Sequence, residues 1–131
     1  MSTTMTDLPP DVGAPFIEGL RDGRLMLQFD RSNGRAQFYP RPQSLWSEAG
    51  TEWREASGRG VIFALTLSRV GPPHLAGAVP YPMALVQLAE GPRMLARIHA
   101  RYDDLAIGQA VEVDWSHPDS RRAFPVFRPS S

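Results

Sequence analysis

The chain of 131 residues contains no cysteine and no lysine. Without cysteine it can form no disulfide, no thiolate metal site and no thiol nucleophile. Because every basic residue is an arginine, the chain also lacks a Schiff-base lysine and the lysine of a phosphate-binding loop. These absences exclude several classes of enzyme and leave a metal site with few ligands to choose from.

Neither sign of charge is in excess, because 14 basic residues balance 14 acidic residues. A dedicated nucleic-acid-binding protein usually carries a clear basic excess, so the balance argues against that function. Long apolar runs are missing as well, and none approaches the roughly 20 residues of a membrane-spanning helix. The polar, proline-rich start does not resemble a secretory signal. We therefore expect a cytoplasmic protein with no membrane partner.

Among the residues that are present, a short apolar pattern near the start predicts one helix. Residues 1–13 are polar and are expected to form a flexible arm, and Pro15 suits the first turn of a helix that stops at Gly23. Phe16 and Leu20, four residues apart, share one face of this helix. Unless another element covers that face, it would be an exposed apolar surface on which a partner could dock.

The next segment, residues 24–56, has the outline of a small zinc-binding ribbon. Alternating apolar residues predict a strand over 24–30, and Asn33-Gly34 is a strong hairpin signal. Prolines and a glycine break residues 40–50 into a loop, and a further strand is predicted after it. The segment thus offers two turns where a ribbon would place its two metal-binding knuckles.

The ligand positions of such a ribbon are occupied by Asp30, Asn33, Ser44 and Ser47. Two residues separate the members of each pair, and about ten residues separate the pairs, which is the spacing of two C-x-x-C knuckles. Neutral amide and hydroxyl oxygens are poor substitutes for thiolates, and a single carboxylate does not make a zinc site. The sequence therefore predicts a degenerate ribbon with no bound metal.

A ribbon that has lost its metal forfeits a large contribution to folding, so another interaction must stabilise it. Large apolar residues lie in or beside the segment: Phe29, Phe38, Leu45, Trp46 and Trp53. The favoured interpretation is that they form a small core in place of the metal. The alternative is that the aromatic rings stack on a ligand.

Residues 57–131 predict a small β-barrel. A long strand starts near Gly58 and Gly60, where a bulge or bend is expected, and two shorter strands follow around a tight turn at Glu90-Gly91. Alternation places four apolar residues on one face of the long strand: Val61, Phe63, Leu65 and Leu67. With two closing strands the total is five, which favours an OB-type Greek-key barrel. Periodicity alone also allows another small barrel or a sandwich.

No catalytic constellation stands out, so the protein is not expected to be an enzyme. Its histidines are His74, His99 and His117, and none lies in a G-x-S-x-G or H-E-x-x-H motif. Arg93, Arg97 and His99 alternate along one predicted strand. This pattern is typical of a solvated outer face, and the alternative is contact with a phosphate group.

Taken in order, these features resemble a known family. The matching blocks are "PFIEGLRDGRLMLQ", "GRAQFYPRP", "WREASGRGVIFALT", "YPMALVQLAEGPRMLARI", "IGQAVEVDW" and "FPVFRP". They cover about residues 15–129, and "QFYPRP" followed by "ASGRG" is the most specific part. The family comprises bacterial and archaeal acyl-CoA-associated proteins that join an N-terminal helix, a rubredoxin-like zinc ribbon and an OB-fold. The chain departs from this family at the four ligand positions.

The resemblance implies a non-catalytic accessory or scaffold subunit without a cofactor. Its partner would be a thiolase-like enzyme, or a related hydratase or aldolase, in a hetero-oligomer whose interface can include a CoA thioester. Candidate contacts with the partner or with CoA are Phe16, Leu20, Phe38, Tyr39, Arg41 and Trp46. Arg41 stands between two prolines, which limit its backbone freedom. A stand-alone acyl-CoA binder and an OB-fold binder of single-stranded nucleic acid are the alternatives.

Overall fold

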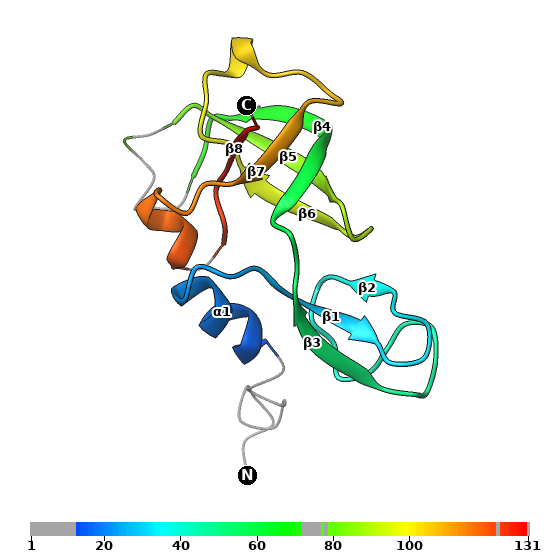
Figure 1. Ribbon diagram of the computed structural model, residues 1–131. Helices are drawn as coiled ribbons and strands as arrows, with labels where there is room; N and C mark the ends of the chain where they lie inside the picture. Colours follow the sequence, from blue (N-terminus) through cyan, green and yellow to red (C-terminus); the bar gives the residue numbers. More distant parts are fainter. Residues whose placement is uncertain (1–12, 72–76, 78, 123, 131) are drawn as a thin grey trace.

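The computed structural model describes residues 13–71, 77, 79–122 and 124–130, and Figure 1 shows their arrangement. The elements, in chain order, are α1 (Ala14–Arg21), β1 (Met26–Asp30), β2 (Ala36–Gln37), β3 (Thr51–Glu55), β4 (Arg59–Ser68), β5 (Tyr81–Leu88), β6 (Arg93–Arg97), the 3-10 helix η2 (Tyr102–Asp104), β7 (Ala110–Val113), the 3-10 helix η3 (Pro118–Arg121) and β8 (Phe127–Pro129). The predicted class, mostly β with a short N-terminal helix, is confirmed. Among the described residues, no helix has the length and apolar character needed to cross a membrane.

The first sheet is three-stranded and antiparallel, with the order β2-β1-β3. The predicted hairpin joins β1 to β2, where the Gly34 N–H donates to the Asp30 carbonyl over 2.8 Å. Gly34 has a φ of 73°, a conformation that favours glycine. Residues 38–50, between β2 and β3, contain no regular element, as the prolines predicted. The sheet therefore has to hold a long loop that makes no backbone ladder of its own.

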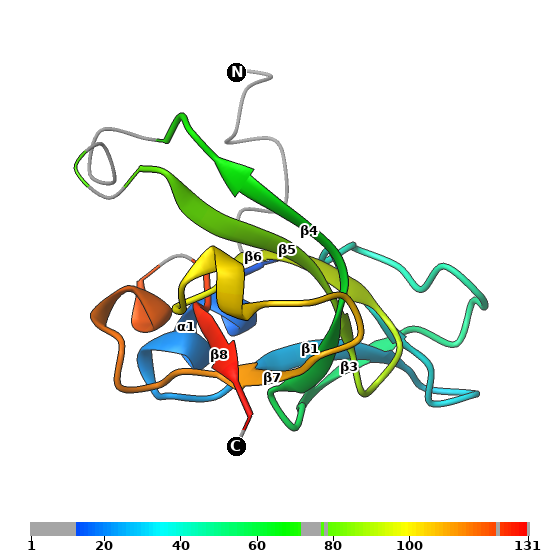
Figure 2. The ribbon, with the colours of Figure 1, turned by 90° about the horizontal axis from the view of Figure 1, so that it is seen from above.

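The second sheet has the order β6-β5-β4-β7-β8, and its neighbouring strands are antiparallel. Its two end strands meet, because Ile98, directly after β6, forms a parallel bridge with Phe127 of β8. The His99 N–H also donates to the Phe127 carbonyl over 2.7 Å. This contact closes the sheet into a barrel, and the predicted OB-type fold is confirmed. The barrel lies beside the three-stranded sheet, and the chain passes from β3 directly into β4 (Figures 1 and 2).

The long strand β4 changes its inward face at a bulge. Its register against β5 shifts between Ile62 and Ala64, so Phe63 is inserted out of step. As a result Ile62 and Leu65 face the core, whereas Val61 and Phe63 are exposed. The prediction that alternating apolar residues share one face of this strand is therefore wrong, because the bulge lies in the middle of the strand and not at its start.

One apolar core joins the barrel, the three-stranded sheet and the helix. Phe127 of β8 belongs to this core with an exposed fraction of 0%, and Leu27 of β1 belongs to the same cluster from the other sheet. The helix contributes Leu20 and Phe16, which are 0% and 4% exposed. The helix face that would be exposed unless another element covers it is covered by β1, η3 and the Phe38 ring, so it is not an exposed docking surface.

Candidate functional site

The four predicted ligand positions meet around the Asp30 carboxylate, Ser44 and Ser47 through their side chains and Asn33 only through its backbone N–H. The Asp30 Oδ2 accepts hydrogen bonds from the hydroxyls of Ser44 and Ser47, the latter over 2.6 Å. Its Oδ1 accepts the Ser32 hydroxyl over 2.6 Å. The same oxygen accepts the N–H groups of Ser32 and Asn33 over 2.7 and 3.1 Å. We call this arrangement the Asp30 hub, and it ties the hairpin turn to the long loop.

The hub holds Asp30 in its ionised form. Hydrogen bonds from the hydroxyls of Ser32, Ser44 and Ser47 lower the pKa of the carboxyl far below its ordinary value, and they outweigh the opposing effect of burial. The donors disperse the negative charge over five hydrogen bonds without a cation.

This donor set does not fit a zinc ion. It contains one carboxylate, and the serine hydroxyls point their protons at it instead of offering lone pairs outward. In the part of the chain that the structure describes, no group of three or more histidine, cysteine, aspartate or glutamate side chains could hold a metal. That residues 24–56 fold without a bound zinc ion therefore stays a prediction, which the chemistry of these side chains supports.

Two buried glutamines fix the rest of the loop. Gln28 in β1 accepts the Arg41 N–H over 2.8 Å and donates to the Arg41 carbonyl over 2.7 Å. Gln37 in β2 donates to Gln28 over 2.8 Å and accepts the Leu45 N–H over 3.0 Å. Gln28 and Gln37 are 4% and 2% exposed. Their amides therefore satisfy the loop backbone, which lacks a neighbouring strand.

Hydrogen bonds, and not a separate aromatic core, hold the loop in place. Three of the five apolar residues predicted to form that core pack against the main core instead: Phe29, Phe38 and Trp53. Leu45 is 54% exposed. The Arg35 guanidinium lies 4.3 Å from the centre of the Trp46 ring, so a cation covers that ring. The prediction of a small local core is corrected accordingly.

An aromatic cleft of about 500 Å³ opens between α1, the start of the long loop and the segment before β8. Phe16 lies between Phe38 and Phe124, with ring centres 5.3 and 6.1 Å apart. Tyr39 packs 4.3 Å from Phe38 and is 52% exposed. The helix adds one carboxylate and one guanidinium to the lining. The cleft thus offers an apolar surface with charge beside it, which suits a ligand that has an apolar part.

The structure brings only some of the predicted contact residues together. This cleft is lined by Phe16, Phe38 and Tyr39. Leu20 has no exposed surface, so its assignment as a contact is corrected. Arg41 is exposed next to the cleft-lining Pro40, and Trp46 lines a second cleft of about 300 Å³ with Arg93. Contact of the exposed residues with a partner or with CoA remains a prediction.

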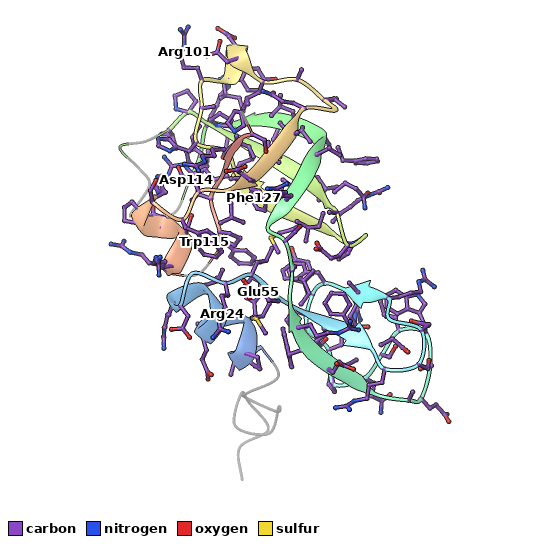
Figure 3. The ribbon with its side chains drawn as sticks, in the orientation of Figure 1. Arg24, Glu55, Arg101, Asp114, Trp115 and Phe127 are labelled. Atoms are coloured by element: carbon purple, nitrogen blue, oxygen red, sulfur yellow. The ribbon has the colours of Figure 1, made fainter. Side chains whose placement is uncertain are left out.

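A cluster around the buried Asp114 carboxylate escaped the sequence analysis. His99 Nδ1 lies 3.1 Å from this carboxylate, which also accepts the Ser116 hydroxyl over 2.5 Å and has Arg128 at 3.4 Å. Burial opposes its ionisation, but the hydrogen bonds and the arginine charge outweigh burial and lower the pKa of Asp114 to about 2. Figure 3 shows Asp114 beside Phe127 in the barrel. Barrel closure, which no sequence spacing reveals, brings the cluster together.

The two described histidines lie together, with ring centres of His99 and His117 4.8 Å apart. His117 Nδ1 accepts the Asp119 N–H over 3.1 Å and so caps η3. Burial lowers the pKa of His117, which keeps the ring neutral in this capping role. His74, the third predicted candidate, lies outside the described residues.

The arginines that alternate along β6 have separate partners and form no common anion site. The Arg93 guanidinium lies 3.7 Å from the centre of the Phe63 ring. Arg97 pairs with Asp119 over 3.5 Å. The favoured prediction of a simply solvated face is therefore too simple, since one arginine stacks and the other is half-buried in an ion pair.

These features define a class of protein: an OB-type barrel with an appended three-stranded sheet and an N-terminal helix. The family model of the ChsH2 C-terminal OB-fold domain matches residues 53–116. A chain of the solved Ltp2-ChsH2(DUF35) aldolase is 30% identical with a TM-score of 0.76, and the match covers 91% of this chain and 94% of that chain. The chain therefore belongs to the ChsH2-type DUF35 family.

Two further relatives extend the comparison. A DUF35-family protein from Sulfolobus solfataricus shares the fold, with a TM-score of 0.64 and 13% identity over 96% of this chain and 92% of that chain. The probable enoyl-CoA hydratase alpha subunit of Thermomonospora curvata is 38% identical over 77 residues, or 58% of this chain. The matched part spans 24% of the length of that curated relative.

Proposed function

We propose that this protein is an accessory subunit of an enzyme that acts on acyl-CoA thioesters. The observation that carries the proposal is its 30% identity, over 91% of its length, to a chain of the Ltp2-ChsH2(DUF35) aldolase. The hydratase name of a second relative supports the same class of substrate. The partner is an aldolase, a thiolase-like enzyme or a hydratase, and the two chains form a hetero-oligomer.

The accessory subunit is proposed to be non-catalytic. Acyl transfer needs a nucleophile, a base and an orienting group within hydrogen-bonding reach of one another. His99 and Asp114 form a base and its orienting group, but the Ser116 hydroxyl donates to the carboxylate and not to the imidazole. Among the described residues, no hydroxyl bonds to the other nitrogen of His99. This pair therefore lacks the nucleophile that would complete a reaction centre.

The aromatic cleft supports a contribution to the thioester site of the complex. Phe38 and Tyr39 offer an apolar surface against which a pantetheine arm or an acyl chain would lie. Arg41 follows the cleft-lining Pro40, and Gln28 fixes its backbone at both N–H and carbonyl. Its guanidinium would pair with a phosphate of CoA. Trp46 would extend the contact with the partner from the second cleft.

Co-purification tests the proposed function. The full chain, tagged and expressed in its native host, is expected to recover an aldolase, thiolase-like enzyme or hydratase in near-stoichiometric amounts, identified by mass spectrometry. Recovery of the chain as a free monomer with none of these enzymes would contradict it.

Calorimetry separates this function from a stand-alone acyl-CoA binder, the second candidate, which the aromatic cleft favours. The isolated chain is expected to show no heat of binding with acetyl-CoA or octanoyl-CoA, whereas the complex binds. In the complex, Tyr39→Ala is expected to weaken thioester binding, and Tyr102→Ala, a matched exposed aromatic in η2, is expected to leave it unchanged. Saturable binding by the isolated chain would support the second candidate instead.

A further inference from the structure

The outer surface of the barrel over β4, β5 and β6 carries exposed apolar side chains. Val61 and Phe63 on β4 are 39% and 46% exposed, and Leu95 on β6 is 49% exposed. The register aligns Ala64, Leu85 and Leu95 in one row across the three strands, on the side opposite to the core. We call this surface the outer sheet face. Figure 2 shows the three strands side by side.

The outward positions of these three strands carry arginine and no aspartate or glutamate. Arg59, at the start of β4, lies opposite Glu112 of β7, and Glu90 in the β5–β6 turn lines the same cleft as Arg93, so Arg93 is the arginine on which the inference rests. Arg97, also on β6, already pairs with Asp119 over 3.5 Å. The face therefore combines an apolar centre with positive charge that no carboxylate of its own strands neutralises.

Two contacts within the chain fix the position of the Arg93 guanidinium. Its Nε donates to the Gln87 side chain over 2.8 Å, and its guanidinium carbon lies 3.7 Å from the centre of the Phe63 ring. Among the described residues it has no ion pair with a carboxylate. A guanidinium fixed in this way loses little entropy when it binds an anion, and arginines beside apolar anchors are frequent centres of binding energy.

We infer that the outer sheet face binds the acyl-CoA enzyme, at a patch of apolar side chains accompanied by carboxylates. This inference rests on the proposed function. Charge complementarity favours this occupant, because the Arg93 guanidinium is fixed beside exposed apolar side chains and, among the described residues, pairs with no carboxylate of this chain. The single aromatic ring of the face, Phe63, is covered by Arg93, so it offers no stacking platform for nucleic-acid bases.

Variants of the full chain test the inference in complex with the enzyme that co-purification identifies. Leu95→Asp and Arg93→Glu are expected to raise the Kd for that enzyme by about tenfold or more, as loss of an interface anchor does. Tyr102→Asp, an exposed aromatic in η2 and outside this face, is the control and is expected to keep the wild-type Kd. Raising the salt concentration is expected to weaken the wild-type complex more than the Arg93→Glu complex.

The outcomes separate the inference from the function on which it rests. If Leu95→Asp and Arg93→Glu, both verified as folded by circular dichroism, bind the enzyme as tightly as wild type, the outer sheet face is excluded and the accessory function stands. If wild type recovers no acyl-CoA enzyme, the proposed function fails and the named occupant fails with it. A homodimer that Leu95→Asp dissociates, or saturable binding of a short single-stranded oligonucleotide that Arg93→Glu abolishes, would assign the face to another partner and overturn the inference.

Discussion

The barrel and the three-stranded sheet are stabilised by different interactions within one short chain. In the barrel, the buried residues are mostly apolar and belong to one cluster that includes Phe127. In the three-stranded sheet, the long loop is held through Asp30, Gln28 and Gln37, which are buried polar side chains. A sheet with little apolar surface of its own can be fixed by a polar network when every member finds a partner, but such a network tolerates few changes.

Phe127→Ala should produce the largest effect, because it removes a fully buried ring at the contact that closes the barrel. A truncation of this kind costs about 3–5 kcal/mol of unfolding free energy. Urea unfolding measures the loss, and hydrogen exchange should show it first in the barrel strands. Equal loss of protection in the three-stranded sheet would show that the two regions unfold as one unit.

Gln37→Ala should act on the other region. The substitution removes the Gln37 amide, which donates to the Gln28 side-chain oxygen and accepts the Leu45 N–H. Leaving such buried groups without a partner costs about 1–3 kcal/mol of unfolding free energy. Hydrogen exchange should accelerate in β1, β2 and β3 and remain unchanged in the barrel. Gln87→Ala, at a partly exposed position on β5, is the matched control and should leave both sheets protected.

Acid should weaken both regions, through different carboxylates. The pKa values of Asp30 and Asp114 are lowered in the folded protein, so each contributes stability above the unfolded pKa near 4 that is lost as pH falls through the folded pKa. For Asp114 the window runs from about pH 4 to about pH 2, and the loss is about 2 kcal/mol. Asp114→Asn should flatten the acid dependence of exchange in the barrel, and Asp30→Asn that in the three-stranded sheet. If Asp114→Asn instead changed the acid dependence of exchange in the three-stranded sheet, and Asp30→Asn that in the barrel, the proposed difference between the two regions would be contradicted.

Leu45→Ser should have the smallest effect. Leu45 is 54% exposed, and only its backbone N–H takes part in the network, so the side chain contributes within about 0.5 kcal/mol. Thermal unfolding checks this value. A loss of unfolding free energy as large as that of Phe127→Ala would instead support the prediction that a small core of apolar residues holds the loop.

Local signals in the sequence predicted much of the fold. Asn33-Gly34 predicted the hairpin, prolines predicted the irregular loop, and the pair spacing placed Asp30, Ser44 and Ser47 at the ligand positions of a ribbon, where the structure brings them together. All of these depend on turn chemistry or short spacings, which the sequence carries directly.

Features set by packing across the barrel could not be predicted in this way. The bulge at Phe63 depends on register against β5, and the His99–Asp114 contact depends on closure between Ile98 and Phe127. The hydrogen bonding of the Asp30 hub could not be predicted from spacing, because a serine can serve as a metal ligand or as a hydroxyl donor to a carboxylate and the spacing is the same for both.

The Asp30 hub also has a consequence for how the protein matures. All of its donors and its acceptor come from the polypeptide, between Asp30 and Ser47. If the segment works without zinc, as predicted, its assembly calls for no ion to be delivered by a chaperone, and the chain has no thiol to be kept reduced. A chelator such as EDTA is expected to leave this sheet intact, so the supply of the subunit would not follow the metal status of the cell.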